Sequence, residues 1–208
     1  MIRQPSPRAS ILTVFFPGLS VAALAVLLAA CGSTPVASTW IGASPEQLVS
    51  EIRAAGAAMP GELDVQPLRD PMVEDLRVRA ARAERAQRYA EAAADLDKAL
   101  ALSPEDPGLL QERAEAAVLE KDLAKAEALA RRAFGLGGKV GPLCRRHWMT
   151  IRQSLALQQT RLMQLQNDGR MKGQALAQWQ QDMAKVATDL ELARRDQDAC
   201  TVSPPPRY

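Results

Sequence analysis

A recurrence of residue types at a spacing of 34 constrains the fold of this chain more than any other feature. Leu76, for example, is followed in this register by Leu110 and Cys144. The other matched sets are Ala80, Ala114 and Trp148; Ala83, Ala117 and Ile151; Tyr89 and Leu123; Ala92 and Ala126; Ala99 and Ala133; and Leu102 and Leu136. Small residues at matched positions let neighbouring helices approach closely. The pattern therefore predicts stacked helix pairs, two over residues 70–140 and the first helix of a third from residue 141.

Helix boundaries in this register are marked by proline and by capping residues. Asp70-Pro71 and Gly141-Pro142 begin two of the first helices, and Asp122 caps a second helix. In the stretch 99–104, ALALSP, we expect Ser103 to be an N-cap and Pro104 to take the first helical position of the next helix. This stretch and the period resemble the tetratricopeptide repeat (TPR), which implies a right-handed solenoid. The family favours glycine where this chain has Gln87 and Lys121.

The alternative to a repeat is a generic alanine-rich bundle whose helix lengths imitate the period. Two repeats need capping at their ends, because a terminal repeat leaves an apolar face open. Residues 141–200 meet this need with two heptad runs separated by Asn167-Asp168-Gly169 and Gly173. We therefore predict an all-α fold, namely a short α-solenoid of TPR helix pairs capped by a C-terminal antiparallel helical hairpin.

The segment that precedes the repeats begins with a helix. Ser44-Pro45-Glu46-Gln47 is typical of a capping box, and Gly56 is a helix stop, which together predict a helix over residues 45–55. A proline- and glycine-rich connector then runs to residue 69. At the other end of the chain, residues 201–208 form a proline-rich tail.

The N-terminus has the composition of a secretory signal peptide. Arg3 and Arg8 precede an apolar run over residues 19–30, and no acid precedes Cys31. The run Leu28 to Cys31, LAAC, resembles the lipobox of bacterial lipoproteins, in which the cysteine is acylated and the chain is cut before it. The resemblance implies a signal peptide over 1–30, lipid on Cys31 and a tether to residue 44. An uncleaved membrane-spanning helix is the alternative.

Gly32 follows the cysteine, where lipoproteins kept in the inner membrane tend to have aspartate. The resemblance therefore favours the outer membrane, facing the periplasm. Removal of residues 1–30 takes two arginines from the 26 basic residues, and the basic residues that remain balance the 24 acidic residues. A neutral chain gives no support for nucleic-acid binding.

Acylation of Cys31 would leave two cysteines in an oxidising compartment. Cys144 and Cys200 lie at the same end of the predicted hairpin, so we expect them to form a disulfide. The alternative is two buried free thiols. Cys144 and His147 also form a C-x-x-H pair, but a structural zinc site needs four ligands and the chain has one histidine.

Residues suited to catalysis are scarce. With a single histidine, no glycine-rich phosphate loop and carboxylates spread over helix faces, the sequence predicts neither an enzyme nor a cofactor or metal. The TPR resemblance implies instead a concave surface, made by the first helix of each pair, that binds a peptide or a partner helix. On that surface we expect the following partner-binding residues: Arg77, Arg85, Gln111, Glu115, Arg145, Met149 and Arg152.

Together these features predict a lipid-anchored periplasmic adaptor that binds a protein partner in envelope assembly, secretion or cell-wall maintenance. One alternative is a structural envelope lipoprotein that self-associates through exposed helix faces, using Leu157, Leu192 and the open face of the first repeat. Another is a hydrolase subunit that borrows its catalytic groups from a partner.

Overall fold

The described part of the protein is all-helical. The structure, a computed structural model, describes residues 42–59, 62, 68–167, 169 and 171–201, which belong to the unit Trp40–Tyr208. These ranges contain seven helices and no strand: α2 (Pro45–Ala55), α3 (Pro71–Arg85), α4 (Tyr89–Leu102), α5 (Pro107–Leu119), α6 (Leu123–Leu136), α7 (Pro142–Asn167) and α8 (Gln174–Ala199). The all-α prediction is confirmed. The predictions for the signal peptide, Cys31 and the proline tail concern residues outside the described ranges.

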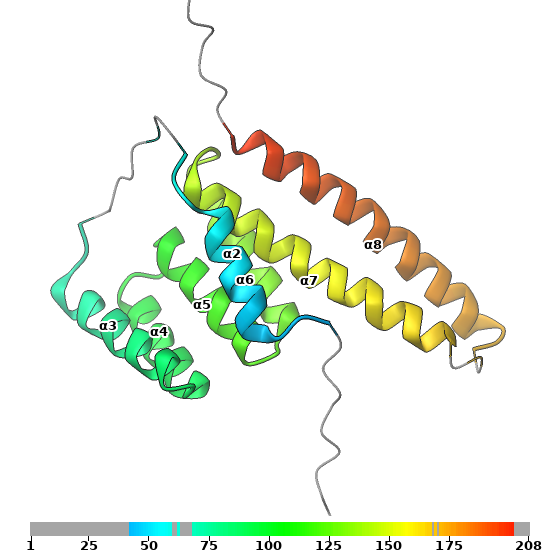
Figure 1. Ribbon diagram of the computed structural model, residues 1–208, viewed down its shortest axis with the longest axis horizontal. Coiled ribbons are helices and arrows are strands. Elements are labelled where there is room, and N and C mark those ends of the chain that lie inside the picture. The colour runs from blue at the N-terminus through cyan, green and yellow to red at the C-terminus, as the bar shows by residue number, and fades with distance from the viewer. Residues whose placement is uncertain (1–41, 60–61, 63–67, 168, 170, 202–208) are drawn as a thin grey trace, which may run out of the picture. The chain divides into compact units, whose positions relative to one another are not determined.

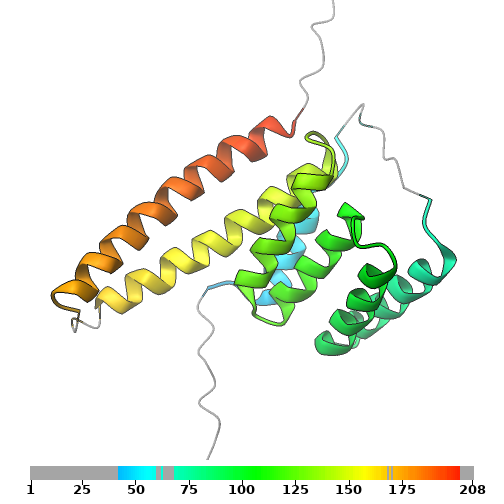
Figure 2. The ribbon, with the colours of Figure 1, turned by 180° about the vertical axis from the view of Figure 1, so that it is seen from behind.

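Helices that follow one another in the sequence pack together. α3 packs against α4, α5 against α6 and α7 against α8, and the pairs are joined by contacts of α4 with α5 and of α6 with α7 (Figure 1). Figure 2 shows the same order of helices from behind. The exception is α2, which precedes the three pairs in the sequence and packs against α5 and α7.

Aspartate caps start several of these helices. Asp70 accepts a hydrogen bond from the Met72 amide at the start of α3, and Asp122 accepts one from Lys125 at the start of α6. The predicted start of α5 was wrong. The helix begins at Pro107 with Asp106 as its N-cap, and Ser103 instead follows the end of α4.

The turns inside the first two helix pairs have the same backbone conformation. Gln87 and Lys121, which lie 34 residues apart, have φ angles of 57° and 65°. In each turn the next amide donates a hydrogen bond of 2.9 Å to the carbonyl five residues earlier, which is the bond that closes a helix C-terminus of the Schellman type. A left-handed conformation favours glycine, so both side chains are held there at a cost.

Burial follows the 34-residue register as well. Four pairs of alanines are at most 3% exposed: Ala80 and Ala114, Ala83 and Ala117, Ala92 and Ala126, and Ala99 and Ala133. The last matched residues are exposed in both helix pairs, with Leu102 at 50% and Leu136 at 45%. At these matched positions, small side chains therefore allow close approach of the helix axes.

A disulfide ties the start of α7 to the end of α8. The Sγ atoms of Cys144 and Cys200 are 2.01 Å apart and their Cα atoms 5.6 Å apart, which confirms the predicted pairing. The Gly141 amide donates a 2.7 Å hydrogen bond to the Cys200 carbonyl beside it. The two long helices therefore run antiparallel. Within the described ranges, no helix is long and apolar enough to cross a membrane.

Candidate functional site

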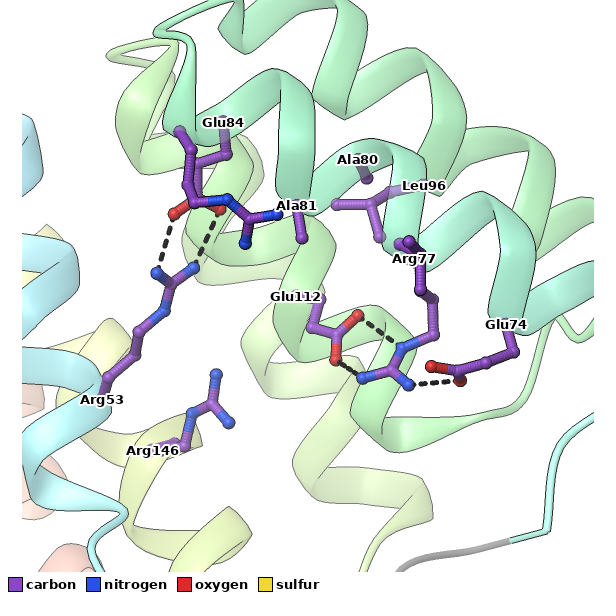
Figure 3. Close-up of a pocket in the computed structure, with 11 residues that line it drawn as sticks. Arg53, Glu74, Arg77, Ala80, Ala81, Glu84, Leu96, Glu112 and Arg146 are labelled. Carbon is purple, nitrogen blue, oxygen red and sulfur yellow. Dashed lines mark hydrogen bonds and ion pairs between the residues drawn. The ribbon is translucent and has the colours of Figure 1, made fainter.

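A groove lies between α3 and the facing parts of α2, α5 and α7 (Figure 3). Its cavity has a volume of about 640 Å³. Ala80, Ala81 and Leu96 give it an apolar floor, and the small alanines leave room above them. Arginine and glutamate side chains form its walls. We call this feature the α3 groove.

Two arginines in the walls are held by glutamates on neighbouring helices. Arg53 of α2 donates to both oxygens of Glu84, at 2.7 and 2.9 Å. Arg77 of α3 forms a two-fold hydrogen-bonded pair with Glu112 of α5 and a 2.6 Å bond to Glu74. Hydrogen bonding to these carboxylates raises the pKa of both arginines. Bidentate pairs of this kind fix the planes of both groups.

A buried carboxylate lies under the opposite wall. Glu115 is fully buried and accepts hydrogen bonds from Arg53 at 2.8 Å and from Arg146 at 3.0 and 2.5 Å. Both arginines are partly exposed, so they neutralise Glu115 from the groove side. Figure 3 shows the Arg146 guanidinium pointing into the space between Arg53 and Glu112.

Behind Glu115, a polar network runs into the core. The Gln111 amide nitrogen donates to Glu115 at 3.0 Å and to the Thr150 hydroxyl at 2.9 Å. Its oxygen lies 2.7 Å from His147 Nδ1, so that nitrogen carries the proton. Burial, followed by the charges of Arg146 and Lys139, lowers the pKa of His147 to about 3. His147 is therefore a neutral core residue.

The expected partner-binding residues lie in three different environments. Arg77 and Arg85 line the α3 groove. Met149 packs beneath α2, and Arg152 donates a hydrogen bond to Gln197 of α8. Three residues are buried, so the prediction that they face a partner was wrong: Gln111, Glu115 and Arg145.

Arg145 holds α2 in place instead. It donates to the carbonyls of Ala55 and Ala57 at 3.0 and 2.9 Å, where α2 ends, and to both oxygens of Glu62 at 2.7 Å. The apolar side of α2, formed by Leu48, Val49 and Ile52, is buried against α5 and α7. α2 thus covers the inner surface that the sequence assigned to a partner, and the α3 groove is the part left open.

Sequence reasoning missed Arg53, Glu112 and Arg146 as residues of this site. A signal for two of them exists, because Val78, Glu112 and Arg146 are matched positions in the 34-residue register and all three line the groove. The predicted partner-binding residues Gln111 and Arg145 directly precede Glu112 and Arg146, and their side chains are buried in the core. Arg53 gives no such signal, since its role depends on where α2 docks.

The groove chemistry suits binding. Its three wall carboxylates are each bonded to arginine, and the Arg146 guanidinium, which is paired with Glu115, also reaches into the open space. Among the described residues, no three metal-ligating side chains are grouped together, and the sulfur of Cys144 is taken up by the disulfide. Comparisons with models of protein families and with curated protein sequences find no match for this chain.

Proposed function

We propose that this protein is a lipid-anchored adaptor of the bacterial envelope, built on a short TPR solenoid. The repeat assignment draws support from the shared left-handed turns at Gln87 and Lys121 and from the matched alanine burial. In this proposal α3–α4 and α5–α6 are the two repeats and α7 is the first helix of a third. The α7–α8 pair acts as the cap, because it covers the apolar face that α6 presents.

The anchor in this proposal is acylated Cys31, with the protein in the outer membrane facing the periplasm. The lipobox-like run and the tether support the anchor. The Cys144–Cys200 disulfide fits an oxidising compartment, because structural disulfides are rare in reducing ones.

The proposed activity is binding of a protein partner in envelope assembly, secretion or cell-wall maintenance, without catalysis. The observation that carries it is the α3 groove, in which the matched positions Val78, Glu112 and Arg146 converge on one open cavity. Its walls are rigid, since their ion pairs cross between α2, α3 and α5. A preorganised groove loses less entropy when a peptide binds.

Filling the groove tests this proposal. Ala81 is exposed and lines the cavity, so Ala81→Trp should occupy it without disturbing the core. Ala94→Trp, on the exposed face of α4, is the matched control. We expect partners that co-purify with the wild-type protein to be lost from Ala81→Trp and kept by Ala94→Trp. Retention of every partner by both variants would exclude the α3 groove as the binding site.

A further inference from the structure

Among the described helices, no third helix buries the apolar residues at the far end of the α7–α8 pair. All the buried residues of α7 lie between Cys144 and Leu155, and α8 has only Val186 and Ala193 buried. Beyond them lie residues 162–167 and 171–179, which we call the tip. None of these residues is buried, although they include Met163 at 46% exposure and Leu165 at 53%.

Basic residues outnumber acidic residues in this region. α7 contains no acidic residue, and residues 128–181 contain only one, Asp168. Arg161, which precedes the tip, and Lys172, which lies within it, are both exposed. An apolar end with basic residues is the pattern of segments that lie in the interface of an anionic bilayer.

The first described residue lies near enough to the tip for a lipid on Cys31 to reach the same bilayer. Gly42, the first described residue, packs on Leu157, because a Cβ added to it would lie 3.0 Å from Leu157 Cδ2. From Leu157 to the end of α7 the helix rises only about 15 Å. The segment from Cys31 to Gly42 spans at most about 40 Å when extended. A lipid on Cys31 and the tip can therefore contact one bilayer.

We infer that the tip of the α7–α8 pair is a second membrane contact, which inserts Met163 and Leu165 into the interface of a bilayer containing anionic phospholipid. The inference extends the proposed anchoring at Cys31. Apolar burial and attraction of Arg161 and Lys172 to phosphate groups favour the contact. Two attachment points would hold the α3 groove in a fixed orientation above the membrane.

Photo-crosslinking to lipid tests this inference. The full-length protein, isolated from cell membranes, is reconstituted in vesicles of phosphatidylethanolamine and phosphatidylglycerol, with p-benzoylphenylalanine at Leu165. The matched control carries the same group at Leu136, an exposed leucine on α6. We expect about tenfold more lipid adduct at Leu165 than at Leu136, and a lower yield without phosphatidylglycerol or at high salt, because salt screens the basic residues.

Equal adduct yields at the two positions would overturn the inference, as would crosslinking of Leu165 mainly to a second copy of the chain. Circular dichroism and the intact disulfide show that each labelled variant is folded. Mass spectrometry of the same samples reports acylation of Cys31. If the protein is not acylated, the ratio measured with added vesicles still decides for or against the tip, and the proposed anchor alone fails.

Discussion

Arg145→Ala should destabilise the protein by detaching the end of α2. The Arg145 side chain is 8% exposed and bonds the carbonyls of Ala55 and Ala57 as well as Glu62. Its loss leaves two helix-end carbonyls without this donor, and each hydrogen bond to a charged group contributes about 1.5–3 kcal/mol. Allowing for water that re-hydrates the exposed side of the site, we expect a decrease of about 2–4 kcal/mol in the free energy of unfolding.

The assay is urea unfolding followed by circular dichroism, with hydrogen exchange of residues 45–55 as a local readout. Arg194→Ala is the control, because Arg194 is largely exposed and forms a weak 3.7 Å ion pair with Glu191. This change should alter stability by less than about 0.5 kcal/mol. Hydrogen exchange in α2 should be faster in Arg145→Ala than in the wild type, and it should be unchanged in Arg194→Ala. A variant as stable as wild type, with unchanged exchange in α2, would refute the role assigned to Arg145.

Four further outcomes are expected. Gln87→Gly should stabilise the protein by about 1 kcal/mol in urea unfolding, since glycine relieves the left-handed turn; a destabilised variant would contradict this. The pKa of His147 is lowered to about 3 on folding, so stability should be full above pH 6.5 and fall as the pH drops toward 3, and His147→Gln should flatten that part of the pH profile. Replacing Cys144 and Cys200 by serine should lower stability by up to about 4 kcal/mol, measured by thermal unfolding; an unchanged melting temperature would contradict this. Metabolic palmitate labelling should be lost in Cys31→Ala, and an unlabelled wild type would contradict the anchor.

Local signals in the sequence were sufficient for most helix boundaries. Ser44 accepts a hydrogen bond from the Gln47 amide at 3.2 Å, and α2 ends before Gly56, as those residues predict. The start of α5 was misplaced because two proline signals, at 104 and 107, lie close together. The structure uses the second, where Asp106 also pairs with Arg69 at 2.8 Å, a contact across 37 residues that no local pattern reveals.

The candidate site was harder to predict for a physical reason. The 34-residue register correctly indicates which helices share an inner side, and Arg77 and Arg85 do line the groove there. The amphipathic pattern of α2 indicates that one face of the helix is buried. It does not indicate which helices that face packs against. Because α2 docks on α5 and α7, Glu115 and Arg145 form hydrogen bonds with α2 and are not available to a partner protein. Docking of this kind depends on tertiary packing, which a single sequence does not encode locally.

Site-specific crosslinking inside cells tests the central claim, that the α3 groove binds a protein partner, most directly. p-Benzoylphenylalanine at Val78 lies in the groove, and the same group at Ala94 lies on the outer face of α4. The account predicts a discrete crosslinked protein from Val78, lost when Arg85→Glu reverses an exposed charge that lines the cavity, and none from Ala94. Equal crosslinking from both positions, or crosslinks from Val78 only to a second copy of the chain, would contradict it.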